Sequence, residues 1–99
     1  MPVFVLMTRL SPECMHDARD RKAYGREWMH KVKAACPDVT WLAHYAILGP
    51  YDYMDIYEAP DLATAHVVSM ISRSEGAVTA ESWQAMPWEE HLRLLESLG

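Results

Sequence analysis

Residues 39–61 read VTWLAHYAILGPYDYMDIYEAPD, two segments rich in β-branched and aromatic residues that are separated only by Gly49-Pro50. Such residues favour strands, and a two-residue separation is typical of a tight β-hairpin. We therefore predict an antiparallel pair of strands over residues 39–48 and 51–59.

Helical and strand-like patterns alternate on both sides of this hairpin. The predicted elements are a strand over residues 3–10, a helix over 17–36, a helix over 62–74, a strand over 77–86 and a helix over 87–98. Asp61 can cap the second helix, and Gly76 ends it. Right-handed crossovers in the order βαββαβ give an antiparallel ferredoxin-like sheet with both main helices on one face. The sequence thus predicts one α+β domain over residues 1–99, with a C-terminal helix.

Composition and charge argue against several classes of partner. The 99 residues carry a net charge of −5, whereas nucleic-acid binding relies on clustered Lys and Arg. The densest basic group is Arg19, Arg21, Lys22 and Arg26, which acidic residues interrupt, so we interpret it as a solvated helix face. No apolar run approaches membrane-spanning length, and the N-terminal residues lack the pattern of a signal peptide. We therefore expect a cytoplasmic protein with neither a nucleic-acid nor a membrane partner.

Several predicted strands are apolar on both faces, although a sheet covered by helices on one side should alternate apolar and polar residues. In the segment over residues 39–48, which this fold places at a sheet edge, one face carries Trp41, Ala43, Tyr45 and Ile47, and the other carries Leu42, Ala46 and Leu48. An apolar edge strand of this kind needs a partner or a cover. We therefore predict a homodimer formed about a two-fold axis. The alternative is a monomer whose C-terminal helix folds over the open face.

The turn at Gly49-Pro50 also predicts which residues of the hairpin lie side by side. With a two-residue turn, His44 lies directly opposite Asp55. A carboxylate next to an imidazole fixes its tautomer and raises its basicity, which suits acid–base catalysis and metal binding. One alternative is a hydrogen bond that only satisfies two polar groups at a cleft or dimer seam. Another is a one-residue bulge at Pro50, which would place the two side chains on opposite faces.

The same hairpin carries a family resemblance. The residues concerned are Gly49-Pro50-Tyr51-Asp52, Glu58-Ala59-Pro60-Asp61, Gly76, the strand over 79–85 and the tail over 88–98. On these residues the sequence resembles the GYD domain family over nearly its whole length. The resemblance implies a ferredoxin-like fold of the dimeric α/β barrel kind, and it implies architecture rather than an activity. Tyr53, Asp55 and Tyr57 depart from the family, in which aliphatic residues are more typical of that strand.

Our leading hypothesis is a homodimer that binds a small, largely apolar or aromatic molecule in a pocket on the sheet face. Tyr53 and Tyr57 share the face of His44 and Asp55. Further candidates for this face are Met7 and Arg9 of the first strand and Glu81 and Trp83 of the last, whose register the sequence does not fix. We expect the aromatic residues to line the pocket, and the His44–Asp55 pair to give it polar specificity.

The competing hypothesis is an enzyme. By analogy with other dimeric α/β barrels, it would be a small oxygenase or isomerase with His44 as the base and Asp55 as the group that orients it. Arg9 would stabilise a developing oxyanion. A third possibility is a subunit or assembly factor that acts through its surface and not through a pocket.

The segment richest in metal-ligating side chains is Cys14-Met15-His16. Together with the seven methionines of the chain, it offers ligand types that bind copper(I) or haem iron. Adjacent residues rarely all point at one ion, however, and Met is an ordinary gap-filler in protein cores. Cys14 and Cys36 form no CxxC pair, so a disulfide framework or a structural zinc site has no support. We therefore predict no metal site and leave any cofactor unassigned.

Overall fold

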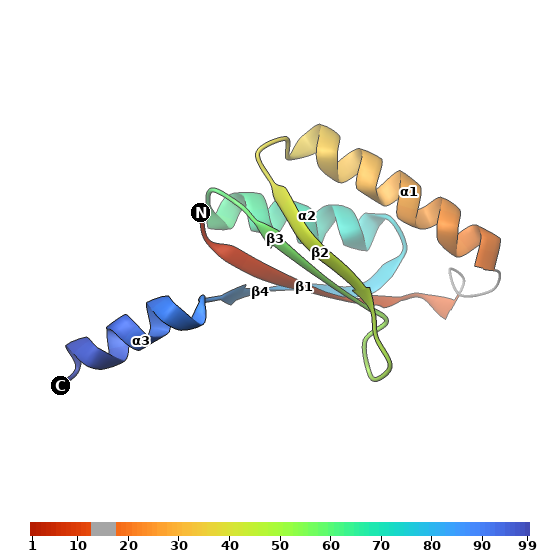
Figure 1. The fold of residues 1–99 in the computed structure, drawn as a ribbon. Helices are drawn as coiled ribbons and strands as arrows, with labels where there is room; N and C mark the ends of the chain where they lie inside the picture. Colours follow the sequence, from red (N-terminus) through yellow and green to blue (C-terminus); the bar gives the residue numbers. More distant parts are fainter. Residues whose placement is uncertain (13–17) are drawn as a thin grey trace.

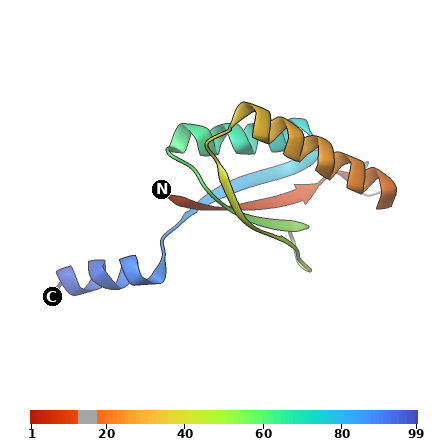
Figure 2. The same cartoon turned by 45° about the horizontal axis from the view of Figure 1, so that its top comes forward.

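The computed structural model describes residues 1–12 and 18–99. Its elements in chain order are β1 (Val3–Leu10), α1 (Ala18–Ala35), β2 (Thr40–Ala46), β3 (Tyr53–Glu58), α2 (Leu62–Ser74), β4 (Ala77–Ala85) and α3 (Trp88–Ser97). The strands form one antiparallel sheet in the order β2-β3-β1-β4, and α1 and α2 lie on the same side of it (Figures 1 and 2). This is an α+β architecture consistent with a ferredoxin-like fold, and it confirms the predicted order of elements.

The hydrophobic core lies between the sheet and its two covering helices. Its largest side chains, each at most 1% exposed, are Phe4 and Leu6 of β1, Tyr57 of β3, Val32 of α1 and Val68 of α2. The rings of Phe4 and Tyr57 stack with their centroids 5.4 Å apart. Burial of each such side chain stabilises the fold by roughly 1.5–3 kcal/mol. The core therefore fixes which face of each strand points toward α1 and α2.

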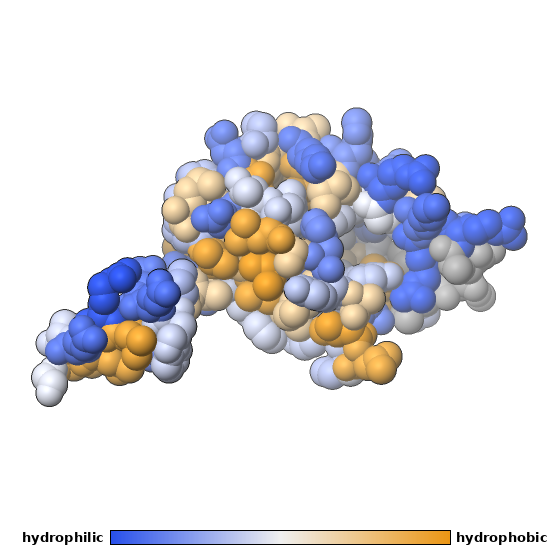
Figure 3. Space-filling view, in the orientation of Figure 1, coloured by the Kyte–Doolittle hydropathy of each residue, from blue (hydrophilic) through white to orange (hydrophobic). Residues whose placement is uncertain are grey.

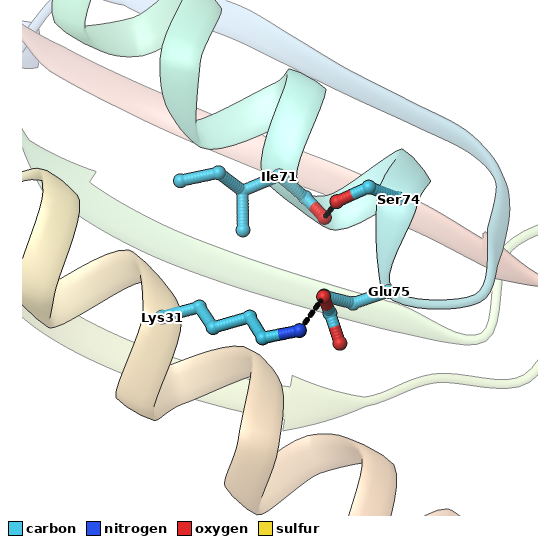
Figure 4. Close-up of polar contacts among 4 residues, drawn as sticks. All are labelled: Lys31, Ile71, Ser74 and Glu75. Atoms are coloured by element: carbon cyan, nitrogen blue, oxygen red, sulfur yellow. Dashed lines mark hydrogen bonds and ion pairs between the residues drawn. The ribbon is translucent and has the colours of Figure 1, made fainter.

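The ends of α2 follow the capping pattern that the sequence predicts. Asp61 has an extended backbone (φ −155°), and its Oδ1 accepts a hydrogen bond of 2.8 Å from the N–H of Thr64. At the other end, the Ser74 hydroxyl donates to the carbonyl of Ile71, and Glu75 forms an ion pair with Lys31 of α1 (Figure 4). Gly76 then adopts φ +107°, a conformation that favours glycine. The ion pair ties α1 to the end of α2 at one side of the cavity described below.

The hairpin confirms the predicted register near its turn but not at its far end. The pairing runs without a slip from Ala46 opposite Tyr53 to His44 opposite Asp55, and then shifts between Trp41 and Ala43. Because an extra residue reverses the alternation of a strand, Trp41 lies on the helix-facing side with His44, and not with Tyr45 as predicted. There the ring of Trp41 packs against Trp28 of α1 and Tyr57 of β3, with centroid distances of 5.3 and 5.0 Å.

The connection between β2 and β3 is longer than the predicted two residues. Ile47 and Asp52 are joined by a backbone hydrogen bond of 3.0 Å outside the strands. Asp52 also bonds to the end of β1: its N–H donates to the carbonyl of Thr8, and its carboxylate accepts from the N–H of Leu10. The strands therefore end earlier than predicted, because the connection pairs with a neighbouring strand as well as with itself.

Among the described residues, no helix covers the second face of the sheet (Figure 2). Its residues include Val5 of β1, Ile56 of β3 and the more exposed Tyr45 and Trp83, which are 54% and 46% exposed. We call this the open face. The alternative prediction that the C-terminal helix folds over this face is wrong, because α3 extends away from the domain (Figures 1 and 2).

The apolar residues of α3 have no cover within the described chain. Trp88, Leu92, Leu95 and Leu98 follow each other at helical spacing, and no residue of α3 is buried. A space-filling view shows hydrophobic residues gathered on one side of α3 and over part of the adjacent domain (Figure 3). Among the described residues, no helix is long and apolar enough to cross a membrane.

Candidate functional site

The hairpin brings His44 and Asp55 together as the sequence predicts. They are a directly opposed pair of β2 and β3, with 2.7 Å between His44 Nδ1 and Asp55 Oδ1. The bulge lies beyond this pair, at Leu42, and not at Pro50, so both side chains stay on the helix-facing side. The side chain of Asp55 is only 10% exposed, whereas that of His44 is 46% exposed. The carboxylate thus lies inside, and the imidazole lies between it and solvent.

Burial dominates the electrostatics of this pair. Desolvation raises the pKa of the Asp55 carboxyl above its ordinary value, and this outweighs the hydrogen bond and charge of His44, which lower it. An ionised carboxylate can only accept hydrogen bonds, so His44 Nδ1 then carries the hydrogen. Nε2 of a neutral His44 is left as an acceptor or base. The pair can therefore bind a donor group of a ligand or take up a proton.

A cavity of about 280 Å³ lies next to the pair, between α1 and the sheet. The sheet side is formed by His44, Tyr53 and Asp55 together with Thr8 and Leu10 of β1; α1 contributes Arg21, Lys22, Tyr24, Gly25 and Trp28; Ser72, Glu75 and Ala77 complete the wall. Although seven of these residues are polar or charged, most of the surface that they present to the cavity is apolar. Such a lining is typical of a site for a small organic molecule.

Aromatic side chains hold the walls of the cavity in place. Trp28 Nε1 donates to Ser72 Oγ at 2.8 Å, and this hydroxyl in turn donates to the carbonyl of Val68. The Trp28 ring meets Trp41 edge-on, and Trp41 stacks on His44 at 5.4 Å. A continuous row of rings thus links α1 to the imidazole. Because each member is fixed by its neighbour, His44 is positioned by packing as well as by Asp55.

Four of the residues predicted to share this face lie on the other one. They are Met7, Arg9, Glu81 and Trp83. Leu6 is the residue of β1 that pairs with Asp55, and Ser82 of β4 pairs with Leu6, so these even-numbered positions share the face of the pair. Odd-numbered residues of β1 and β4 must then point to the open face. Arg9, whose Nε donates to the carbonyl of Pro50 at 2.7 Å, is therefore not the guanidinium of the His44–Asp55 site.

Tyr57 is on the predicted face but does not line the cavity. Its side chain is wholly buried, and its hydroxyl lies 2.7 Å from Ser82 Oγ. Burial raises the pKa of this phenol above its ordinary value. Tyr57 is thus a core residue, whereas Tyr53 does line the cavity.

The residues on the open face form a cluster of their own around Glu81. Its two carboxylate oxygens accept hydrogen bonds from the Tyr51 hydroxyl at 2.8 Å and from Trp83 Nε1 at 3.3 Å. The rings of Tyr51 and Trp83 meet edge-on at 5.9 Å. The hydrogen bond to Glu81 raises the pKa of Tyr51. This cluster is separated from the cavity by the sheet itself.

Most residues of the cavity wall were not predicted from the sequence, and three residues of this region show why. Trp28 follows the apolar spacing of α1, which is also the pattern of an ordinary core residue. Trp41 was placed on the wrong face because of the bulge. Arg21 was interpreted as part of a solvated basic face, yet it lines the cavity.

The candidate metal-ligating segment, Cys14-Met15-His16, lies outside the described residues. Within residues 1–12 and 18–99, no group of three or more His, Cys, Asp or Glu side chains could hold a metal ion. Cys36 is buried, and burial raises the pKa of its thiol.

Comparisons with known proteins agree with the fold. The sequence model of the GYD domain matches residues 4–95. The chain is 29% identical over 90 residues to the "Glutamine synthetase and cystathionine beta-lyase binding protein" of Thermus thermophilus, covering 88% of this chain and 90% of that protein.

Two solved structures are similar in fold. The crystal structure of TTHA0845 from Thermus thermophilus superposes with a TM-score of 0.56 at 22% identity, covering 88% of this chain and 95% of that one. The crystal structure of FFRP-DM1 gives 0.54 at 18% identity, covering 87% and 100%. At these identities the two structures support the architecture alone.

Proposed function

The chain belongs to the GYD domain family, and from this starting point we propose that it is a binding protein that takes up a small, largely apolar or aromatic molecule. The observation that carries the proposal is the cavity of about 280 Å³ with the His44–Asp55 pair at its wall. Tyr53 and Trp28 supply aromatic surface there. The pair supplies polar groups that can orient a ligand.

The buried carboxylate supports this proposal on energetic grounds. Desolvating a charged group destabilises a fold unless the group is paired and hydrogen-bonded. Asp55 has one such bond, to His44, and its pKa is still raised by burial. Groups with perturbed pKa values that lie in cavities are often functional. An apolar residue at position 55 would fill the same space without this cost.

The first test is native mass spectrometry of the untagged protein, which reports any retained molecule and the number of subunits. We expect extra bound mass. The retained molecule is then titrated into apoprotein, and His44→Ala should weaken its affinity about ten-fold, the effect of losing roughly one hydrogen bond. The matched control is His30→Ala, an exposed histidine of α1 that should leave the affinity unchanged. A bare mass, together with no binding of either aromatic probe, naphthoate or naphthalenemethanol, would overturn the proposal.

Of the three residues predicted for an enzyme's active site, only His44 and Asp55 lie together. His44 as base and Asp55 as orienting group are favoured by their 2.7 Å separation. Arg9 is on the opposite face, so the predicted oxyanion role has no support from the geometry. An oxygenase or isomerase of this kind would lose its turnover with His44→Ala, whereas a binding protein would lose only affinity. Turnover of the retained molecule by the wild type would decide for the enzyme.

We also propose that a second copy of the chain covers the open face. Within residues 1–12 and 18–99, one sheet face has no helix over it, and the amphipathic helix α3 has no partner. A two-fold pair can bury both surfaces at once. Ending the chain after Met86 should lower the mass measured by light scattering from that of a dimer to that of a monomer. A full-length monomer at micromolar concentration would overturn this part of the proposal.

Binding of another protein is a second candidate function. The Thermus relative is named for binding glutamine synthetase and cystathionine β-lyase. In this chain the observation that favours a protein partner is the exposed apolar side of α3. Purified glutamine synthetase should then be retained by the immobilised full-length chain but not by the chain that ends after Met86. Equal retention by both would exclude α3 as the contact.

A further inference from the structure

Arg21 is the one arginine that lines the cavity among the described residues. It lies in the first turns of α1, and its side chain is half-buried. Its Nε atom is buried and has no hydrogen-bond partner in the described part of the chain. The guanidinium carbon lies 6.0 Å from the centroid of the Tyr53 ring. A buried donor without an acceptor destabilises the empty site, and a ligand acceptor would remove this cost.

Apart from Lys22, the other charged groups of the cavity wall have partners among the described residues. Glu75 is paired with Lys31 (Figure 4), and Asp55 is paired with His44. Lys22, beside Arg21 on the same wall, adds a second positive charge. Because Lys31 neutralises Glu75, the two cations Arg21 and Lys22 face a single carboxylate, Asp55, and the cavity region carries one net positive charge, although the protein as a whole carries a net charge of −5.

From the positive charge of Arg21 and the aromatic rings around it, we infer that the cavity binds small aromatic anions. Arg21 holds the carboxylate of the ligand, and the ring lies among the side chains of Tyr24, Trp28 and Tyr53. A planar guanidinium matches a carboxylate in geometry, and a cation that lies over a ring is itself oriented by it. A cavity of about 280 Å³ is small for a ligand site, which favours a ligand of one or two rings.

This inference rests on the proposed function, because it names the chemical class of the molecule in the same cavity. The test compares two probes of nearly equal shape, naphthoate and naphthalenemethanol, by isothermal titration calorimetry. Wild-type protein should bind naphthoate at least ten-fold more tightly than the neutral alcohol. Raising the salt concentration should weaken only the naphthoate, since only the anion is attracted by charge.

Variants of one helix separate the role of Arg21 from general charge. Arg21→Gln should reduce naphthoate affinity at least ten-fold, to that of the alcohol, and should leave alcohol binding unchanged. Arg26→Gln removes an equal charge from an exposed position of α1 that does not line the cavity, and should change neither affinity. Arg21→Lys should restore part of the preference. If Arg21→Gln does not fold, Arg21→Lys takes its place: a loss of naphthoate affinity that Arg26→Lys does not share would support the role of Arg21, and equal affinities of the two variants would refute it.

The outcomes distinguish this inference from the proposal beneath it. Equal affinity of the wild type for both probes, with both weakened by His44→Ala, would overturn the preference for anions but support the binding cavity. Absence of binding by either probe would overturn both. Equal losses of naphthoate affinity in Arg21→Gln and Arg26→Gln would show a general effect of charge and refute the role of Arg21.

Discussion

Replacing the buried carboxylate of Asp55 by its neutral isostere should make the protein more stable at neutral pH. The side chain is 10% exposed, and its pKa is raised from 3.8 by burial, despite the opposing hydrogen bond and charge of His44. In Asp55→Asn the amide oxygen can still accept from His44 Nδ1, so the pair keeps its hydrogen bond. His44 is 46% exposed and remains solvated, so it is not left as an unpaired buried charge.

The size of the effect follows from the pKa. Each unit by which burial raises the pKa of Asp55 corresponds to about 1.4 kcal/mol that the ionised carboxylate subtracts from the free energy of unfolding. For a domain of this size, 1 kcal/mol changes Tm by about 4–8 °C. Asp55→Asn should raise Tm at pH 7 accordingly. A stabilised variant that binds its ligand less well would also show that the carboxylate is retained for function.

The pH dependence supplies an independent check. A carboxyl whose pKa is higher in the folded state than in the unfolded state destabilises the fold fully above the folded pKa, and this penalty disappears as the pH falls toward the unfolded value. The advantage of Asp55→Asn over the wild type should therefore shrink as the pH falls from the raised pKa toward 3.8. The assay is thermal unfolding followed by circular dichroism across this range, with Asp38→Asn, an exposed aspartate, as the control. A lower Tm for Asp55→Asn at pH 7, with a constant difference at every pH, would refute the reasoning.

Three further predictions concern stability, each measured by urea unfolding. Gly25→Ala should stabilise by about 0.5–1 kcal/mol, because alanine favours a helix and an added Cβ meets no atom within 4 Å; a loss would mean that the glycine is needed by the backbone. Asp61→Ala should lower the free energy of unfolding by about 1 kcal/mol, because α2 loses its cap. Asp61→Asn, which keeps an oxygen acceptor, should retain most of that stability. Tyr57→Phe should cost about 1 kcal/mol, because the core keeps its ring and loses the hydrogen bond to Ser82; an unchanged midpoint would contradict this contribution.

The fold was predictable because its signals are local. Each signal depends on a few neighbouring residues of the chain. The structure confirms three of them: the strand register next to Gly49-Pro50, the helix cap at Asp61 and the helix end at Gly76. The same locality explains why the His44–Asp55 pair was predicted correctly. Its two strands are consecutive, so the connection that joins them also fixes their register.

The rest of the site depends on partners that are distant in sequence. The register of β1 against β3 and β4 is set by packing of the core, and an error of one residue moves a side chain to the other face. Met7, Arg9, Glu81 and Trp83 were misplaced for this reason. The role of Arg21 was also missed, since a charged residue on a helix is classified by what lies opposite, and the sequence alone does not show that the cavity is there.

The extra residue at Leu42 has a consequence for how the chain tolerates insertions and deletions. It separates the part of β2 that is held by the turn from the part that is held by the Trp28 and Tyr57 rings. If one residue is inserted or deleted before Thr40, the register shift can re-form at a neighbouring position of β2. His44 then stays opposite Asp55. No register shift lies between residues 47–52 and His44, so the same change there would turn the imidazole to the opposite side of the sheet. Length variation in relatives with this pair should therefore concentrate ahead of β2.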